Sequence, residues 1–211
     1  MDIHTKKVKG VYRRLAKWYD STRKVWDPKF AALAEKEFNR LLAEYIKDGM
    51  EILDLGVGTG INIERILGHN ISFESYKGID LSAEMLAEAK RKFGHLENLT
   101  LCTGDIMHLE IDKEYDGIIS TLVFSHLRHQ EEIVQKLLAV LKPGGVLLLL
   151  FFSAKPDPSV VDKLILHIYR TVLHFDHVPI EVMKKFPSPK VEQHFPSLGG
   201  QMSIYIFQKE K

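Results

Sequence analysis

The sequence predicts an α/β fold with a mostly parallel sheet, and three observations support that prediction. Apolar strand-like runs alternate with helical patterns between residues 50 and 152, as parallel strands joined by helical crossovers require. The first run opens into a glycine-rich turn, and the next two end in an acid. At 211 residues and 45% hydrophobic composition, the chain can bury one core, so we expect a single domain over residues 1–211.

The glycine-rich turn is the most informative segment of the chain. An apolar run leads into Gly56, Gly58 and Gly60. Glycine permits positive φ and lets another molecule approach the bare backbone, which suits a nucleoside cofactor lying across a strand-to-helix turn. A dinucleotide-binding fingerprint has glycine at its first, third and sixth positions, whereas the sixth position here is Ile61, where we expect a helix to begin. The spacing therefore argues against NAD.

The following strands end in polar residues that suit the same cofactor. The second predicted strand, Phe73–Asp80, ends in an acid about 20 residues past the glycines, where both ribose hydroxyls of a nucleoside can be bound. Ser82 is expected to cap the next helix, in which Met85 lies early. The third predicted strand, Leu99–Ile106, contains a further acid, Asp105. The fourth and fifth strands are predicted over Tyr115–Leu122 and Leu147–Phe152.

The two ends of the chain are expected to differ in structure. Two helices are predicted over residues 4–26 and 28–47, with Pro28 at the start of the second. A further helix is predicted over residues 159–175, after the fifth strand. The last predicted elements are the two strands of a hairpin, residues 190–195 and 201–207, and their loop, residues 196–200.

These landmarks stand in the order of the motifs of class I S-adenosylmethionine (SAM) methyltransferases, and the chain resembles that family over residues 52–152. The glycine-rich turn resembles motif I, and the Leu-Lys-Pro-Gly-Gly turn over residues 141–145 is common in the family. The resemblance implies a Rossmann-like, seven-stranded mixed sheet of order 3-2-1-4-5-7-6, with the last strand antiparallel and helices on both faces. It also implies SAM as the cofactor and S-adenosylhomocysteine as the product.

The resemblance also implies which residues bind the cofactor. Asp80 is expected to bind the ribose hydroxyls, and the backbone at Gly56 and Gly58 to lie against the ribose and methionine parts. Asp105 is expected to meet the adenine amino group, with Met85 on the adenine side. The full set of expected cofactor-binding residues is Tyr19, Asp54, Gly56, Val57, Gly58, Gly60, Asp80, Leu81, Met85, Gly104, Asp105, Ile106 and Thr121.

The loop after the fourth strand, residues 121–129, is expected to contact the methyl acceptor. It lacks the Asn/Asp-Pro-Pro-aromatic motif of DNA and glutamine amino-methyltransferases and the acid of magnesium-dependent catechol-type enzymes. His126 is the best candidate for a general base, and a role as a pocket wall is the alternative. No metal site is predicted, since pairs of histidines without further ligands are a weak metal signal. The expected substrate contacts are Tyr12, Phe124 and His126.

Residues 1–47 are expected to form lid helices over a Rossmann-like core of residues 48–211. The spacing of Tyr12, Tyr19 and Asp20 resembles the opening of ubiquinone/menaquinone C-methyltransferases and bacterial phospholipid N-methyltransferases. The resemblance implies that aromatic residues of this segment close over SAM.

The N-terminal segment is also strongly basic. Residues 1–29 contain nine Lys and Arg against three Asp, although the whole chain has a net charge of +1. A basic amphipathic helix can lie on an anionic membrane surface, or it can pack on the domain with its lysines in water. The sequence leaves both alternatives open for residues 4–26.

The sequence therefore predicts a metal-independent enzyme that transfers a methyl group from SAM, by in-line displacement, to a small-molecule or lipid-like acceptor. A cytoplasmic location, with peripheral membrane contact as an option, fits the absence of a membrane-length apolar run and of a signal-peptide pattern, and the single Cys102. A nucleic-acid or protein methyltransferase is one alternative, against which the near-neutral total charge counts. A SAM-binding regulatory protein without turnover is the other.

Overall fold

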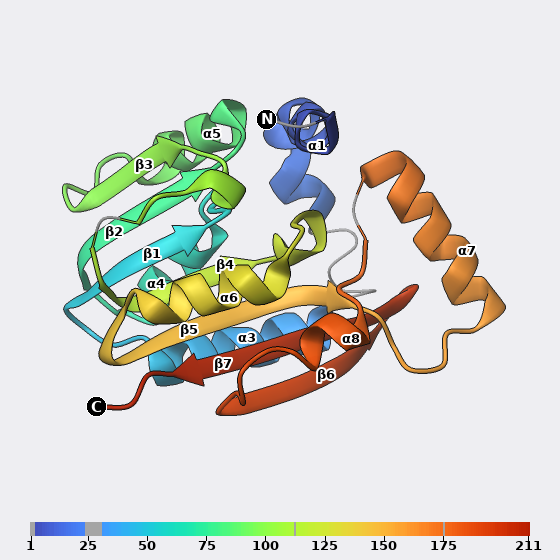
Figure 1. The fold of residues 1–211 in the computed structure, drawn as a ribbon. Helices are drawn as coiled ribbons and strands as arrows, with labels where there is room; N and C mark the ends of the chain where they lie inside the picture. Colours follow the sequence, from blue (N-terminus) through green and yellow to red (C-terminus); the bar gives the residue numbers. More distant parts are fainter. Residues whose placement is uncertain (1–2, 24–30, 112, 175) are drawn as a thin grey trace.

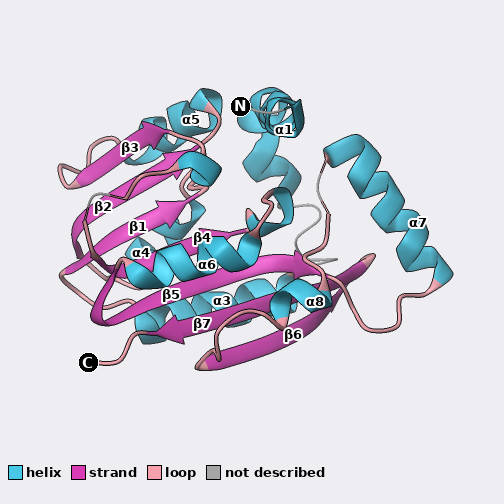
Figure 2. Ribbon diagram, in the orientation of Figure 1, coloured by secondary structure: helices cyan, strands magenta, loops and turns pink. Residues whose placement is uncertain are grey.

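The computed structural model describes residues 3–23, 31–111, 113–174 and 176–211, which form a seven-stranded sheet with helices on both faces (Figures 1 and 2). The strands are β1 Met50–Leu55, β2 Phe73–Asp80, β3 Leu99–Thr103, β4 Tyr115–Thr121, β5 Leu141–Ser153, β6 Val191–Ser197 and β7 Gly200–Gln208. The α-helices are α1 Ile3–Leu15, α3 Ala32–Tyr45, α4 Ile61–Gly68, α5 Ala83–Phe93, α6 Gln130–Ala139, α7 Val160–Ile168 and α8 Ile180–Met183. Short 3-10 helices are η1 Ala16–Trp18, η2 Ile106–His108 and η3 Phe124–His126, and a π-helical turn, η4, spans Tyr169–Leu173.

The strand order is β3-β2-β1-β4-β5-β7-β6, which confirms the predicted topology. β1 to β5 pair in parallel, whereas β7 pairs antiparallel with both β5 and β6. The hairpin between β6 and β7 is tighter than the predicted loop over residues 196–200, because pairing continues to Ser197 and Gly200. Gly199 turns the chain with φ +79°, a conformation that glycine adopts without steric cost.

Two hydrophobic clusters cover the two faces of the sheet. On one face of the sheet lie α3 and α4 (Figure 1), and Phe38 of α3 and Ile63 of α4 belong to the cluster there. On the other, Val134 of α6 and Met183 of α8 do the same. β5 carries an uninterrupted buried run from residue 145 to residue 153, as a central strand covered on both faces should.

Several predicted boundaries differ from the observed ones. The helix predicted over residues 4–26 is divided, because α1 ends at Leu15, a 3-10 turn follows, and helix resumes over residues 19–23. β5 begins at Leu141, since the Leu-Lys-Pro-Gly-Gly turn already pairs with β4 across a register shift. The helix predicted over residues 159–175 widens into the π-helical turn η4 after Ile168. The predicted helix start at Pro28 lies outside the described residues.

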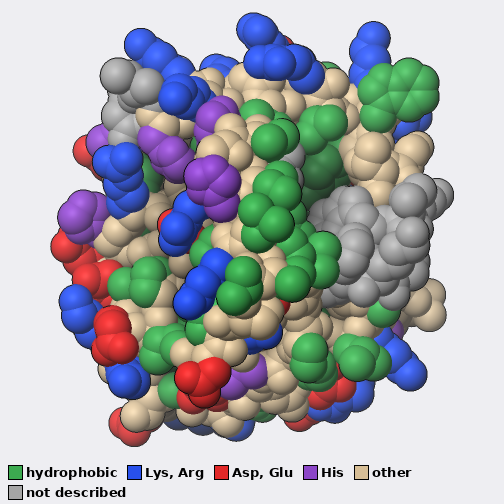
Figure 3. All heavy atoms as spheres, turned by 90° about the vertical axis from the view of Figure 1, so that its right-hand side faces the viewer, with side chains coloured by type: hydrophobic (Ala, Val, Ile, Leu, Met, Phe, Trp, Pro, Cys, Tyr) green, Lys and Arg blue, Asp and Glu red, His purple; other side chains and the backbone are tan. Residues whose placement is uncertain are grey.

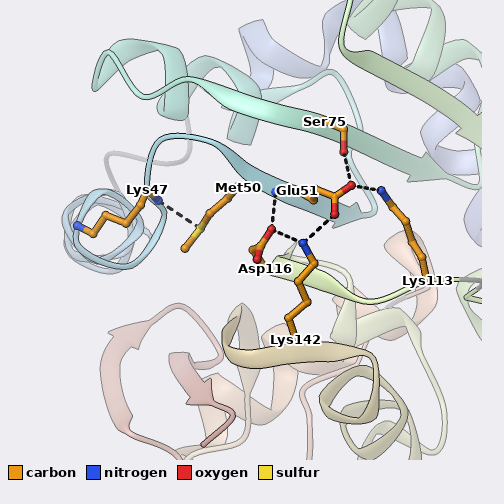
Figure 4. A network of polar contacts seen from close by, with 7 residues as sticks. All are labelled: Lys47, Met50, Glu51, Ser75, Lys113, Asp116 and Lys142. Carbon is orange, nitrogen blue, oxygen red and sulfur yellow. Dashed lines mark hydrogen bonds and ion pairs between the residues drawn. The ribbon is translucent and has the colours of Figure 1, made fainter. Parts of the chain in front are cut away.

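The amino ends of the strands are closed by a network of paired charges (Figure 4). Lys142 of β5 places its Nζ 2.8 Å from a carboxylate oxygen of Glu51 on β1 and 2.9 Å from one of Asp116 on β4. Lys113 pairs with the other oxygen of Glu51. Hydrogen bonds from these lysines lower the pKa of Glu51 to about 2. The charges at this end of the sheet therefore neutralise one another.

Within the described part of the chain, no helix combines the length and the apolar character that a bilayer crossing would need.

Candidate functional site

A cavity lies at the carboxyl ends of the parallel strands, where open α/β sheets bind ligands. We call it the glycine-loop cavity. α1 and Tyr19, the residue that follows η1, contribute to its wall together with the loops after β1, β2, β3 and β4. Its lining residues are Thr5, Val8, Tyr12, Tyr19, Gly56, Gly58, Asp80, Leu81, Met85, Gly104, Asp105, Ile106, Met107, Thr121, Leu122, Val123, His126 and Leu127.

The glycine loop between β1 and α4 can form only with glycine at two positions. Gly56 has φ +75°, and a Cβ there would lie 2.0 Å from Cγ2 of Val123. Gly60 has φ +88°, and a Cβ there would lie 2.7 Å from the ring of Phe93. Both positions therefore combine a left-handed backbone with no room for a side chain. Gly60 acts through this packing and does not line the cavity.

Asp80 is held rigidly at the end of β2. One carboxylate oxygen accepts a hydrogen bond from the backbone N–H of Gly58 at 2.9 Å, and the other from that of Ser82 at 2.8 Å. Burial raises the pKa of Asp80, while these backbone donors act in the opposite direction. A carboxylate has about four lone-pair sites, so these backbone donors leave acceptor capacity for a ligand. This remaining acceptor capacity and the bare glycine backbone beside it fit the ribose hydroxyls of a nucleoside.

Asp54 lies outside the cavity, contrary to the expectation that it contacts the cofactor. Its side chain is 0% exposed and accepts hydrogen bonds from the Tyr76 hydroxyl at 2.6 Å and the Asn62 amide at 3.2 Å. Burial raises the pKa of Asp54 to about 7. The same Asn62 amide donates to the hydroxyl of Thr121, which does line the cavity. Asp54 therefore acts on the site indirectly, through Asn62 and Thr121.

Two other expected site residues are also placed in the core. Val57 is 1% exposed and belongs to the cluster under α3 and α4. Phe124, expected to contact the substrate, is 1% exposed and stacks on Phe151 with ring centroids 5.8 Å apart. The side chain of Phe124 is buried because η3 turns it toward β5, and its neighbour His126 reaches the cavity instead.

The loop after β4 contributes residues that the sequence did not indicate. Leu122 lines the cavity with φ +62°, a conformation that costs a branched side chain about 1–3 kcal/mol. Val123 and Leu127 line it as well. In the loop after β3, Asp105 caps η2 by accepting a hydrogen bond from the N–H of Met107 at 3.0 Å. Strained backbone of this kind gathers at functional sites, but no sequence pattern reveals a leucine with positive φ.

The N-terminal segment packs over the cavity as a lid. Tyr12 and Tyr19 line the cavity with ring centroids 6.0 Å apart. Asp20 fastens this segment to the core, because its carboxylate accepts from the Thr59 hydroxyl at 2.6 Å and pairs with Lys92 at 3.0 Å. The free space beneath the lid is about 110 Å³, which is below the roughly 300–1,000 Å³ of typical ligand pockets.

His126 joins the lid to the core. Its Nε2 lies 2.8 Å from the Tyr12 hydroxyl, and its Nδ1 lies 3.4 Å from the carbonyl oxygen of His174. The contacts fit a neutral ring in which Nδ1–H donates to the carbonyl and Nε2 accepts from tyrosine. Burial lowers the pKa of His126 to about 4. The ring is therefore neutral near pH 7, but it is a weak base.

Comparison with known proteins shows which proteins the chain resembles. The family described as a methyltransferase domain matches residues 52–145. The chain is 33% identical over 158 residues to malonyl-[acyl-carrier protein] O-methyltransferase 2 of Ilyobacter polytropus, covering 72% of this chain and 56% of that protein. It is 27% identical to phosphatidylethanolamine N-methyltransferase of Cereibacter sphaeroides, covering 88% of this chain and 93% of that one. The chain spans about half the length of the malonyl-[acyl-carrier protein] relatives it matches.

Solved structures show the same fold. N-methyltransferase NodS of Bradyrhizobium japonicum, in complex with S-adenosylhomocysteine, superposes with a TM-score of 0.64 at 14% identity, covering 87% of this chain and 89% of that one. The sheet order and the glycine loop define a Rossmann-like methyltransferase fold. By these matches, the chain is similar to the class I SAM-dependent methyltransferases, whose cofactor is SAM.

Proposed function

We propose that this protein transfers a methyl group from SAM to a small-molecule or lipid-like acceptor, by an in-line displacement that uses no metal ion. The observation that carries the proposal is the glycine-loop cavity, where a rigid acid, bare glycine backbone and a tyrosine-bearing lid meet at the carboxyl ends of the strands. The relatives named for malonyl-[acyl-carrier protein] and phosphatidylethanolamine support an acceptor that is neither nucleic acid nor protein side chain.

Each side of the cavity has a proposed role toward the cofactor. Asp80 would accept hydrogen bonds from both ribose hydroxyls, and the backbone at Gly56 and Gly58 would lie against the ribose and methionine parts. Asp105 and Met85 would flank the adenine. The remaining cofactor contacts that we propose are Tyr19, Leu81, Gly104, Ile106 and Thr121, all of which line the cavity.

The main catalytic task of the chain is alignment. Bound SAM supplies a methyl group on a positively charged sulfur. The protein must hold the acceptor in line with that group and exclude water, which lowers the barrier by fixing geometry in advance. Tyr12 and Tyr19 line the cavity, and we propose that they exclude water from it.

His126 is better suited to position the acceptor than to act as a strong general base. Its pKa of about 4 is far below the neutral range in which a general base is most effective. Its Nε2 also accepts a hydrogen bond from Tyr12. We propose that His126 forms the wall beside the acceptor, and its role as a general base stays a prediction to be tested.

Methyl transfer with tritium-labelled SAM to fractions of a cell extract tests the proposed function. We expect label in the small-molecule or lipid fraction with the wild type and none with Asp80→Ala. Label in protein or nucleic acid would instead support the other enzyme class. No transfer, in a protein that binds S-adenosylhomocysteine, would support a regulatory SAM-binding protein.

Exposed apolar side chains support a lipid-like acceptor and peripheral membrane contact. Val160 of α7 is 82% exposed and Trp18 is 68% exposed. Figure 3 shows hydrophobic side chains gathered on the face that α7 forms, with Lys, Arg and His side chains beside them. The exposed apolar side chains of α7 and η4 are Val160, Val161, Leu164, Ile168 and Val172.

The structure changes which side chains would enter a membrane. Val8 of α1 is buried and Tyr12 lines the cavity, so the apolar side of α1 faces the core and not the solvent. We propose that α7 and Trp18 supply the apolar contact, while the basic residues within 4–26 supply electrostatic attraction of about 1 kcal/mol each near an anionic surface.

Sedimentation with vesicles tests the membrane contact. The wild type should sediment with anionic vesicles at low salt, be released at high salt, and ignore neutral vesicles, because charge attraction is screened beyond about 8 Å at physiological salt. Two variants should lose sedimentation while remaining folded: Leu164→Ser with Ile168→Ser, and Lys9→Gln with Arg13→Gln, Arg14→Gln and Lys17→Gln. A wild type that stays in solution at low salt would leave residues 4–26 as a lid alone.

A further inference from the structure

A second cavity, of about 710 Å³, lies next to the glycine-loop cavity. Its volume is within the range of small-molecule sites. Leu127 lines both cavities. Four segments far apart in the sequence form its wall: the start of α1, the loop from η3 to α6, the turn after α7, and the start of α8. The lining residues are His4, Lys7, Ser125, Leu127, Arg128, His129, Gln130, Arg170, His174, Asp176, His177, Pro179 and Val182, and we call this cavity the basic pocket.

The basic pocket has an excess of positive charge. Its lining includes Lys7, Arg128 and Arg170, and the lone carboxylate among its lining residues is that of Asp176. Asp176 is already engaged, because it pairs with Nε of Arg170 at 2.8 Å and accepts from the backbone N–H of His177 at 2.8 Å. Among the described residues, no carboxylate lies within ion-pair distance of Lys7 or Arg128.

Several arginine and lysine side chains outside the pocket do have acid partners. Arg40 pairs with Glu37 and Glu44, and Lys142 pairs with two acids at the amino ends of the strands. Two cations directed at one cavity repel each other, and an anion bound between them would remove that repulsion. A guanidinium offers five donors in a planar fork that matches phosphate and carboxylate oxygens.

We propose that the basic pocket binds an oxyanion group, a phosphate or a carboxylate, carried by the methyl acceptor. The proposal rests on the proposed function, since it places the acceptor beside the cofactor cavity. His126 connects the two cavities. Its ring contacts Tyr12 of the glycine-loop cavity, and His174 of the basic pocket provides the carbonyl beside its Nδ1. His4, another residue of the basic pocket, contacts the His126 carbonyl at 3.1 Å.

This arrangement specifies how an acceptor would lie. Its charged end would occupy the basic pocket between Lys7 and Arg128, and its reacting end would extend past His126 toward the glycine-loop cavity. The group that is methylated and the group that is recognised would therefore be at opposite ends of the acceptor. Two sources share this chemistry: a water-soluble phosphate or carboxylate compound, and an anionic lipid headgroup delivered along the apolar face of α7, which continues through η4 to Arg170.

Titration with inorganic phosphate at constant ionic strength tests the oxyanion site. The melting temperature of the wild type should rise with phosphate more than with chloride. In Lys7→Gln with Arg128→Gln, the apparent phosphate affinity should fall at least tenfold. The control, Arg91→Gln with Lys184→Gln, removes the same charge from residues outside the pocket and should respond as the wild type does. An equal response of wild type and Lys7/Arg128 double variant would overturn the proposal.

Calorimetry with S-adenosylhomocysteine separates this inference from the proposed function. The Lys7/Arg128 double variant should bind S-adenosylhomocysteine as tightly as the wild type, which also shows that it is folded. If the wild type does not bind S-adenosylhomocysteine, the proposed function is wrong. A wild type that binds it, but shows no specific phosphate effect, would overturn the oxyanion site alone.

Competition then identifies the source of the oxyanion. Glycerol 3-phosphate and phosphatidylglycerol vesicles are each titrated against bound radiolabelled phosphate, and the phosphate that remains bound is measured. Displacement by glycerol 3-phosphate would support a water-soluble acceptor. Displacement by the vesicles alone, lost in Leu164→Ser with Ile168→Ser, would support a lipid headgroup. Displacement by neither would show that phosphate binds there only as an adventitious ion, and would overturn the proposal.

Discussion

Glu51 and Asp54 lie on the same strand, β1, yet their surroundings shift the pKa of the two carboxyl groups in opposite directions. Glu51, at the amino end, pairs with Lys113 and Lys142, and these partners lower its pKa to about 2. Asp54, near the carboxyl end, is fully buried with neutral hydrogen-bond partners, and burial raises its pKa to about 7. At the amino end of the sheet, the charged side chains pair with one another. The carboxyl end instead holds polar groups that can exchange their hydrogen-bond partners.

The difference extends to the neighbouring residues of each end. Around Glu51 the acids and lysines neutralise one another (Figure 4). At the carboxyl ends, Asp80 keeps lone pairs for a ligand, and Lys7 and Arg128 face a cavity without a carboxylate partner among the described residues. We therefore take the paired charges at the amino ends as structural, and the charged groups with unused hydrogen-bonding capacity at the carboxyl ends as parts of a binding site. Four substitutions can test this distinction.

The largest expected effect is at Asp80. Replacing it by alanine leaves two ribose hydroxyls without a charged acceptor, and such hydrogen bonds contribute about 1.5–3 kcal/mol. The dissociation constant for S-adenosylhomocysteine should rise roughly ten- to a hundredfold, as measured by calorimetry. Asp116→Asn, at the amino end, is the matched control and should leave it unchanged. An unaltered dissociation constant in folded Asp80→Ala would reject this assignment.

The second effect concerns turnover in His126→Ala. A general base contributes about 10²–10⁴ to the rate, but we expect a smaller fall in kcat, because burial holds the pKa of His126 at about 4. KM for the acceptor should rise instead, as suits a pocket wall. The measurement is a pH–rate profile of both proteins. A fall of 10²–10⁴ together with loss of a limb at low pH would establish His126 as the base.

The third effect is the pH dependence of stability at Asp54. The folded state keeps a proton on Asp54 up to about pH 7, whereas the unfolded chain releases it near pH 4, so this residue makes stability fall as pH rises between these values. Asp54→Asn removes that dependence. Relative to the wild type, the variant should gain up to about 1.4 kcal/mol for each pH unit across this window. Urea unfolding of both proteins at pH 4.5 and 7 measures the change, and parallel curves would contradict it.

The smallest effect is expected at Glu51. Its folded-state pKa is lowered, so the stability it provides is present above about pH 4.5 and is lost as pH falls toward 2. The side chain is 27% exposed, and pairs of this kind contribute about 0.2–1 kcal/mol. Glu51→Gln should therefore lower the free energy of unfolding by no more than about 1 kcal/mol at pH 7. The difference between variant and wild type should become smaller with added salt, and S-adenosylhomocysteine binding should be unchanged.

The sheet could be predicted from the sequence because its evidence is local. Each strand of the parallel part ends in a short signal, such as the glycines after β1 or the acid at Asp80, and the order of these signals matches the family. The glycine loop, the Ser82 cap and the helix start at Ile61 all lie where the pattern predicts them. Loops of this kind depend on residues that are adjacent in sequence.

The parts that were not predicted depend on packing between distant segments. Phe124 and His126 belong to one turn, and the fold decides which of them is buried against Phe151. The contact of Asp20 with Thr59 joins residues 39 positions apart. The basic pocket combines four separate segments, so the positive charge that the sequence shows as scattered residues becomes a cavity only after folding.

The imidazole of His126 forms part of the partition between the two cavities. One ring nitrogen meets the lid tyrosine and the other meets the carbonyl of His174, so an occupant on either side that shifts Tyr12 or His174 alters the magnetic environment of one nitrogen. The ring is therefore an intrinsic spectroscopic probe. In a protein labelled with nitrogen-15 on histidine, Nε2 should report the arrival of the cofactor and Nδ1 the arrival of the acceptor, each read from a single residue without any attached dye.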